Sequence, residues 1–295
     1  QYHMGPTVQL DDYPYVHFQL MIDEELAMMD LPRMFHHPCD MGGRNGPFIN
    51  AYEWPALVQL LNDDYHEIRT GKAEQPERAA RRLFERIDRA AERAGGEAKL
   101  EKLPAEVLAK LEAALEPEAR EIFNDKAANI PDTLEGKTIV IEFARGGPVG
   151  SMPLPPYYGY ASSLANCSEE MLANAAILYV WGTPEESRRK NRARARPGED
   201  ASILFHGSPE SVMLKDYGCD DMEYLIETSD KPGTLRIEAH DKVFHIPVER
   251  IDNRVDLTTF VREEPATWNP ADVERLDTAL LNACTKLWAR LKESK

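Results

Sequence analysis

Two acidic segments directly follow short apolar runs, and together they have the residue types of one active site. Thr7–Leu10 runs into Asp11 and Asp12, and Thr138–Ile141 runs into Glu142. Each pattern predicts a buried strand that ends in carboxylates and a loop. Open α/β sheets bind their ligands at the carboxyl ends of strands. The two segments therefore predict one shared site for a metal ion or a hydroxyl group.

These carboxylates suit phosphoryl transfer, in which positioning and charge neutralisation carry most of the catalysis. Asp11 is the predicted base that accepts a proton from a substrate hydroxyl, and Asp12 would assist through metal-bound water. Glu142 would bind magnesium through water, and Gly146 and Gly147 allow a close backbone approach to a ligand. The alternative is that the two aspartates only form a turn or cap a helix.

A cluster of positive charge stands out in this acidic chain. Thr183-Pro184-Glu185-Glu186 predicts a capped helix start, and the cations follow within that helix. One interpretation is an exposed helix end with cations near its C-terminus. The other is a segment that closes over a polyphosphate, with Arg188 and Arg192 acting in catalysis and Arg189 and Arg196 holding the nucleotide. The cluster comprises Arg188, Arg189, Lys190, Arg192, Arg194 and Arg196.

Three further residues are candidates for contact with the acceptor substrate: Tyr15, Arg145 and His37. His37 belongs to a loop segment, 36–40, that contains metal-ligand types, but adjacent histidines usually point apart, so we expect a substrate contact there. A second loop, 148–160, is rich in proline and tyrosine. Its tyrosines would stack on a base or sugar, or else pack within the loop.

The remaining elements form an alternation of strands and helices, which predicts an α/β fold with a largely parallel sheet flanked by helices. We expect helices over 14–29 and 53–61, two or three amphipathic helices within 74–128, and a buried strand over 176–181. A hairpin is predicted from Thr234–Ala239 and Val243–Val248, and Asn269-Pro270 begins the last helix.

Composition excludes several classes of function. The chain has 295 residues, 42% of them hydrophobic, and a net charge of −16. We expect no general binding to nucleic acid or to anionic membranes, because both are polyanions. No apolar run is long enough to span a bilayer, and no secretory signal is visible. The four cysteines form no CxxC, which favours a reduced, cytoplasmic protein.

Four segments resemble the uridine kinase and phosphoribulokinase group of P-loop kinases. Leu10–Tyr15 is similar to the group's second strand with its acidic base, and Ile139–Glu142 to its strand that ends in a glutamate near magnesium. Pro47–Trp54 resembles the segment before the acceptor-supporting helix, and Arg188–Arg196 the arginine-bearing lid. The resemblance covers roughly residues 7–62 and 136–220. It implies a P-loop NTPase-like fold, ATP and Mg²⁺ as cofactors, and a small-molecule substrate.

The sequence departs from this group in one respect. It contains no GxxxxGK[ST] motif, and Gly136-Lys137-Thr138 has Pro131 where the first glycine should stand. The resemblance places the first strand and the P-loop upstream of Gln1.

The resulting hypothesis divides the chain into three parts. Residues 1–70 and 136–230 form a kinase-like core, 71–135 a helical insertion, and 231–295 a small C-terminal hairpin plus helix. The expected function is ATP-dependent phosphoryl transfer to a hydroxyl of a nucleoside- or sugar-like metabolite. A non-catalytic nucleotide- or metabolite-binding protein is the main alternative, and a toxin-like or antibiotic-modifying kinase is another. A homo-oligomer is compatible with each of these functions.

Overall fold

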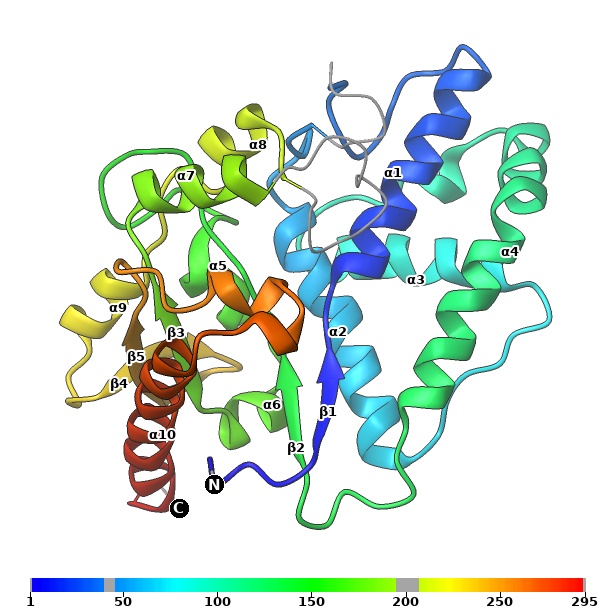
Figure 1. Ribbon diagram of the computed structural model, residues 1–295. Coiled ribbons are helices and arrows are strands. Elements are labelled where there is room, and N and C mark those ends of the chain that lie inside the picture. The colour runs from blue at the N-terminus through cyan, green and yellow to red at the C-terminus, as the bar shows by residue number, and fades with distance from the viewer. Residues whose placement is uncertain (1, 40–45, 195–206, 294–295) are drawn as a thin grey trace.

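The computed structural model describes residues 2–39, 46–194 and 207–293. Over this range the protein is an α/β structure in which short strands lie beside a group of long helices (Figure 1). None of the described helices is long and apolar enough to cross a membrane.

The first two strands form a parallel pair. β1 (Thr7–Leu10) and β2 (Thr138–Ile141) have the predicted bounds, and they pair in register from Thr7 opposite Thr138 to Leu10 opposite Ile141. Parallel strands need a long crossover, and here the connection includes four helices. The first of these, α1 (Tyr13–Met28), is separated from β1 by the two residues Asp11 and Asp12.

A second sheet is formed by β3 (Ile177–Trp181), β5 (Lys242–Asp252) and β4 (Thr234–Ala239), in that order. β4 and β5 form the predicted antiparallel hairpin. β5 is longer than predicted, because its last five residues pair in parallel with β3. The hairpin therefore belongs to a sheet with β3. The sequence predicts one largely parallel sheet with a separate hairpin, whereas within the described residues β3 pairs with the hairpin and only β1 and β2 form the other sheet.

The two sheets leave strand edges uncovered. Among the described residues β2 pairs only with β1, and β3 pairs only with β5. All four residues of β2 are half-buried, and Val180 of β3 is exposed although both runs are apolar. The strands are therefore less buried than their composition predicts.

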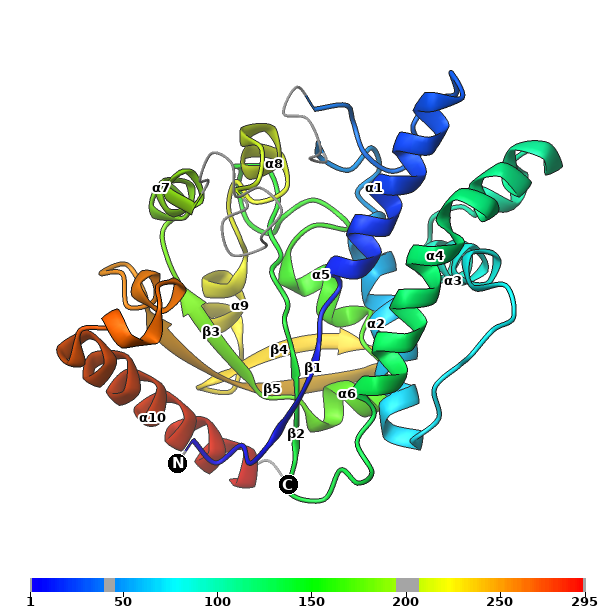
Figure 2. The ribbon, with the colours of Figure 1, turned by 45° about the vertical axis from the view of Figure 1, so that its right-hand side comes forward.

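Four helices pack together beside β1 (Figures 1 and 2). They are α1, α2 (Glu53–Thr70), α3 (Ala79–Arg93) and α4 (Ala105–Asn129). One hydrophobic core joins all four, and it includes Phe18, Leu57, Leu83, Leu111 and Phe123. Segment 71–135, which we expect to be an insertion, is helical, and its two long helices share this core with α1 and α2.

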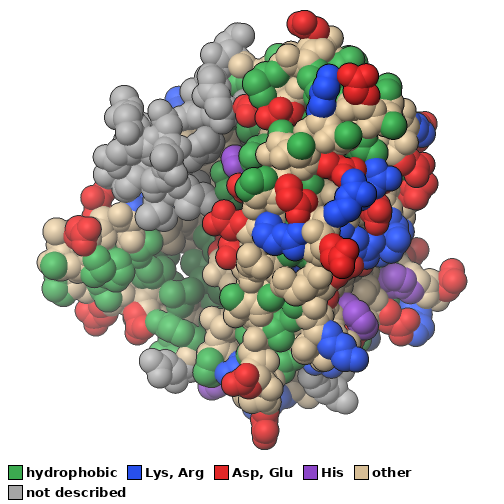
Figure 3. All heavy atoms as spheres, turned by 90° about the vertical axis from the view of Figure 1, so that its right-hand side faces the viewer, with side chains coloured by type: hydrophobic (Ala, Val, Ile, Leu, Met, Phe, Trp, Pro, Cys, Tyr) green, Lys and Arg blue, Asp and Glu red, His purple; other side chains and the backbone are tan. Residues whose placement is uncertain are grey.

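Charged residues cover the outside of this helical layer. Several of their ion pairs join positions four residues apart on one helix, as in Arg81–Glu85, Lys110–Glu106 and Arg120–Glu116. The space-filling view shows positive and negative side chains interspersed over this face (Figure 3). Such exposed pairs contribute little to stability, and the pattern is that of a solvated surface.

A polar network lies inside the helical layer. The Tyr15 hydroxyl donates a hydrogen bond to Asp64 at 2.5 Å, and Arg86 donates to the same carboxylate at 2.7 Å. Lys126 completes the cluster with an ion pair of 2.6 Å to Asp64. Because Asp64 is buried among these partners, the network ties α1, α2, α3 and α4 together.

The remaining helices surround the second sheet. α5 (Gly159–Ala165), α6 (Glu169–Asn174) and α9 (Met222–Thr228) share a core with β1, β4 and β5. α10 (Pro270–Glu293) lies along β5, where Arg290 pairs with Glu249 at 2.5 Å (Figure 2). α7 (Pro184–Arg194) and α8 (Glu210–Lys215) lie at the end of the molecule toward which β1 and β2 point (Figure 1).

Candidate active site at the strand ends

The two acidic strand ends lie side by side, as the sequence predicts. Leu10 pairs with Ile141 at the ends of β1 and β2, so Asp11 and Glu142 are the next residues on adjacent strands. The amide of Glu142 donates to the Leu10 carbonyl at 2.9 Å. Neighbouring strands lie about 4.8 Å apart, so the two carboxylate-bearing positions share one edge of the sheet.

Asp11 is half-buried and only partly engaged. Its Oδ1 accepts a hydrogen bond of 2.9 Å from the Tyr13 amide at the start of α1. Its Oδ2 accepts no hydrogen bond from the described part of the chain. Burial raises the pKa of Asp11, the Tyr13 hydrogen bond opposes this shift, and the nearby Asp12 adds to it. The residue thus forms a turn and still offers one oxygen to a ligand.

Asp12 forms an ion pair with Arg145 at 2.6 Å, across the loops that follow β1 and β2. The Arg145 side chain is 1% exposed and also donates to Ser163 Oγ at 3.1 Å. Its guanidinium lies over the rings of Phe143 and Trp54, at 4.3 and 5.1 Å from their centroids. Arg145 was predicted to contact the acceptor, but in the structure it is buried beneath the strand ends and neutralises Asp12.

Glu142 is exposed, and its Oε1 accepts a hydrogen bond of 2.5 Å from the side-chain amide (Nε2) of Gln9. Across residues 2–39, 46–194 and 207–293, no group of three or more His, Cys, Asp or Glu side chains could hold a metal ion. Magnesium often uses only one or two carboxylates and completes its shell with water and phosphate. Glu142 fits that chemistry. Asp12 fits it less well, because Arg145 already neutralises its carboxylate.

The basic cluster lies on α7, and one of the two hydrogen bonds of its predicted capping box is present. Thr183 Oγ1 accepts a hydrogen bond of 3.2 Å from the Glu186 amide. Arg188 pairs with Glu185 at 3.2 Å and Arg189 with Glu186 at 2.5 Å, so both bind acidic residues of the same helix. Lys190 donates to the carbonyl of Asn253 at 2.8 Å and also pairs with Asp256 at 3.5 Å, while Arg192 is exposed. Arg196 lies outside the described residues.

Among the described residues no hydrogen bond or ion pair joins the arginines of α7 to Asp11, Asp12 or Glu142. α7 follows β3, so it stands at the same end of the molecule as Asp11 and Glu142 (Figure 1). In neither ribbon view does α7 lie against β1 or β2 (Figures 1 and 2). Convergence of these groups on one polyanion therefore stays a prediction.

Two predicted substrate contacts lie in different surroundings. Tyr15 is 1% exposed and donates its hydroxyl to Asp64 within the helical core, so we no longer propose it as a substrate contact. His37 is exposed, in keeping with a loop contact. Its neighbour His36 is the buried one, stacked on Phe48 at 4.5 Å between centroids, and burial lowers its pKa.

Asp216, at the end of α8, supports the site and was not predicted from the sequence. This buried carboxylate accepts a hydrogen bond of 3.3 Å from the Phe48 amide, and Lys215 donates to the Phe48 carbonyl at 2.8 Å. Burial raises the pKa of Asp216 to about 6. Phe48 also packs edge-on against Trp54, which lies over Arg145, so α8 and the loop before α2 support the strand-end site. No local sequence signal marks Asp216, because its partners are far away along the chain.

The geometry therefore combines a partly free aspartate, an exposed glutamate on the adjacent strand, and a buried arginine that neutralises a second aspartate. Comparison of the chain with protein-family models, with curated proteins and with solved structures finds no match.

Proposed function

We propose that the protein transfers a phosphoryl group from Mg²⁺-ATP to a hydroxyl of a small, nucleoside- or sugar-like metabolite. The observation that carries the proposal is the position of Asp11. It stands at the carboxyl end of a parallel strand, half-buried, with one carboxylate oxygen free of hydrogen bonds to the described residues. Such an oxygen is suited to accept a proton from a hydroxyl as that hydroxyl attacks phosphorus.

The surroundings of Asp11 support this role. Its raised pKa makes it a stronger base than an exposed aspartate, and the charge of Asp12 is already compensated by Arg145. A hydroxyl that approaches Asp11 therefore meets one uncompensated carboxylate. Glu142, on the adjacent strand, would hold magnesium through water, and the ion when bound would neutralise charge on the phosphates.

The basic helix has a subsidiary part in the proposal. Arg188 and Arg192 would act on the transferring group, and Arg189 and Arg196 on the nucleotide. The ion pairs of Arg188 and Arg189 with Glu185 and Glu186 join exposed or half-exposed groups. Exposed pairs contribute little to stability and exchange readily for a phosphate. Arg192 is exposed and has no ion pair with another described residue.

One observation favours a second candidate, a protein that binds a nucleotide or metabolite without transferring phosphate. Asp12 is held by Arg145, which leaves Glu142 as the better metal ligand of the two predicted. A single carboxylate binds magnesium weakly until phosphates complete the shell. On this alternative the strand ends bind a ligand, and no phosphoryl transfer follows.

The test is incubation of the chain with Mg²⁺-ATP and a panel of nucleosides and sugars, followed by ADP release and ³¹P NMR of the products. We expect ADP to form with at least one acceptor. We expect Asp11→Asn to lower turnover by about 10²–10⁴-fold while nucleotide affinity is retained. Asp132→Asn, which changes an exposed aspartate on a distant loop, is the matched control. Ligand binding without ADP release would favour the binding protein, and equal turnover in Asp11→Asn would remove Asp11 from the chemistry.

A further inference from the structure

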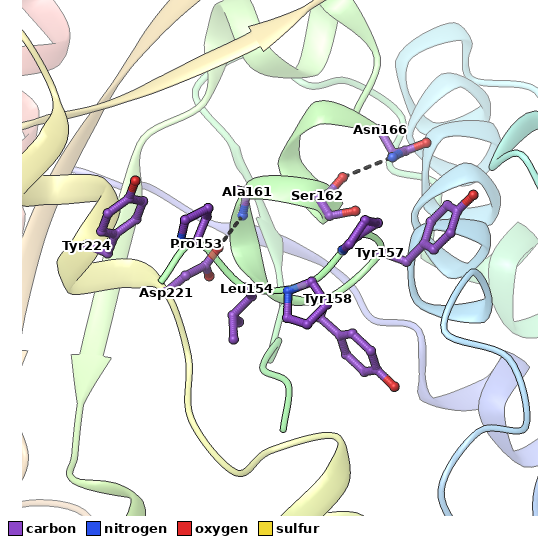
Figure 4. A pocket seen from close by; sticks show the side chains of 11 residues that line it. Pro153, Leu154, Tyr157, Tyr158, Ala161, Ser162, Asn166, Asp221 and Tyr224 are labelled. Atoms are coloured by element: carbon purple, nitrogen blue, oxygen red, sulfur yellow. Dashed lines mark hydrogen bonds between the residues drawn. The ribbon is translucent and has the colours of Figure 1, made fainter. Parts of the chain in front are cut away.

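A pocket of about 360 Å³ lies away from the Asp11 carboxylate, between the loop after β2, α5 and α9 (Figure 4). One wall is the segment Pro153–Tyr158, the floor is the outer face of α5, and the far side is α9 with Tyr224. Its volume is within the range of small-molecule sites. The sequence pattern of this loop was noted above, but the proposed transfer makes no use of it.

The frame of the pocket is held by hydrogen bonds. The carboxylate of Asp221, at the start of α9, accepts hydrogen bonds from the amides of Tyr160 and Ala161, at 2.6 and 3.0 Å. Gly159 adopts a φ of +80°, and a Cβ there would approach the Asp221 carboxylate to 2.6 Å, so only glycine fits. Asn166 accepts a hydrogen bond from Gln59 at 3.1 Å. The walls are therefore positioned before any ligand arrives.

The pocket presents no free charge. No lysine, arginine or histidine lines it, and Asp221 is its sole ionisable carboxyl group within the described residues. Both oxygens of Asp221 are already used by the α5 amides. An anionic ligand would find no counter-ion here, and the one carboxylate is buried and already hydrogen-bonded, which favours a neutral ligand.

Hydroxyl groups are the polar groups that remain available. Ser162 Oγ and the phenolic hydroxyls of Tyr157, Tyr158 and Tyr224 make no hydrogen bond with the described residues, and all four side chains are exposed or half-buried. Figure 4 shows Tyr224 beside Pro153 at one end and Tyr157 and Tyr158 at the other, with Ser162 between them. The hydroxyls of Tyr157 and Tyr158 point away from the other labelled side chains, so Ser162 and Tyr224 are the candidates for contact with a ligand. Proline and tyrosine rings offer apolar faces, while hydroxyls donate and accept hydrogen bonds at the edges.

We propose that this pocket binds a neutral sugar ring, free or as part of a larger molecule. The apolar faces would cover one side of the ring, and Ser162 and Tyr224 would hydrogen-bond its hydroxyl groups. The inference does not depend on phosphoryl transfer, because binding is measured with no nucleotide present.

The test is isothermal titration of the full chain with ribose, glucose and uridine, with adenine as a sugar-free ring and glucose 6-phosphate as a charged analogue. We expect a neutral sugar or the nucleoside to bind, adenine to bind more weakly, and the phosphate to bind about tenfold more weakly than glucose. Absence of binding by all neutral sugars, or binding of adenine alone, would overturn the proposal.

Variants that remove single hydroxyl groups localise the binding. Ser162→Ala and Tyr224→Phe should each weaken binding by about 5–10-fold, because each removes one hydrogen bond to the ligand. Neither hydroxyl has a described protein partner, so the unfolding temperature should not change. Ser211→Ala, which changes an exposed serine of α8, is the control. If both variants bind the sugar as tightly as the control, the sugar is not in this pocket.

Discussion

Arg145 neutralises Asp12 across 133 residues of sequence, through an ion pair of 2.6 Å that joins the loops after β1 and β2. The arginine is buried against Trp54 and Phe143, so its charge is shielded from water. The pair holds the two loops together at the point where the carboxylates of the proposed site begin. Loss of this ion pair should therefore affect both the stability of the protein and the geometry of the proposed site.

Arg145→Ala should destabilise the protein by about 3–5 kcal/mol, because removal of one partner leaves a carboxylate partly buried without its counter-ion. Urea unfolding monitored by tryptophan fluorescence measures the change. The matched control is Arg254→Ala, which breaks the exposed pair with Asp252 and should have much less effect. Similar losses in the two variants would show that the Arg145 pair is no more important than a surface contact.

Asp216 should make stability depend on pH near neutrality. Burial raises its pKa in the folded state to about 6, above the unfolded value of about 3.9, so the folded state favours the protonated form. The contribution of this group to stability is therefore greatest at low pH and is lost as the pH rises through 6. Asp216→Asn removes the ionisation and keeps an acceptor for the Phe48 amide.

Between pH 7.5 and 5.5 the wild type should gain about 1 kcal/mol of unfolding free energy relative to Asp216→Asn. Urea unfolding of both proteins at several pH values measures this difference. Parallel pH profiles for the two proteins would mean that the Asp216 carboxyl group titrates near its ordinary value in the folded state.

Tyr15→Phe should reduce stability and leave activity intact. The hydroxyl of Tyr15 donates to the buried Asp64, so its loss should cost about 1–3 kcal/mol. Tyr65→Phe is the control, because the Tyr65 side chain is buried and its hydroxyl has no hydrogen bond to the described residues. The unfolding temperature and the rate of ADP release are measured for both variants and the wild type. A selective loss of turnover without loss of stability would restore Tyr15 as a substrate contact.

If Asp11 is the base, activity should fall at acid pH. The carboxylate must be ionised to accept a proton, and burial raises its pKa above the ordinary value. The acid limb of kcat/KM should therefore have its midpoint above about 3.9, the ordinary pKa of an aspartate. The residual activity of Asp11→Asn should lack this limb. An acid limb that persists unchanged in Asp11→Asn would assign the titration to another group.

Features set by neighbours in sequence were predicted well. β1 and β2 have their predicted bounds because a short apolar run between polar residues has few alternatives. The Thr183 N-cap and the β4–β5 turn are likewise local, since their hydrogen bonds join residues only a few positions apart. The helical character of 71–135 follows from the same local propensities.

Features that depend on distant partners were predicted less well. Tyr15 and His37 had the residue types of substrate contacts, but only packing decides that Tyr15 is buried and that His36, rather than His37, lies in the core. Arg145 followed a strand in the expected place, and burial against two aromatic rings turned it into a structural partner of Asp12. Asp216 was indistinguishable from an ordinary helix-end residue until its contact with Phe48 was known.

The sequence by itself determined where the first two strands begin and end and that each of them ends in carboxylates. It did so because apolar periodicity and turn chemistry act over a few residues. The tertiary structure decided which of those carboxylates is neutralised, which remains free, and which loops surround them. That choice rests on contacts between residues more than 100 positions apart, and their free energies depend on burial, which no local pattern specifies.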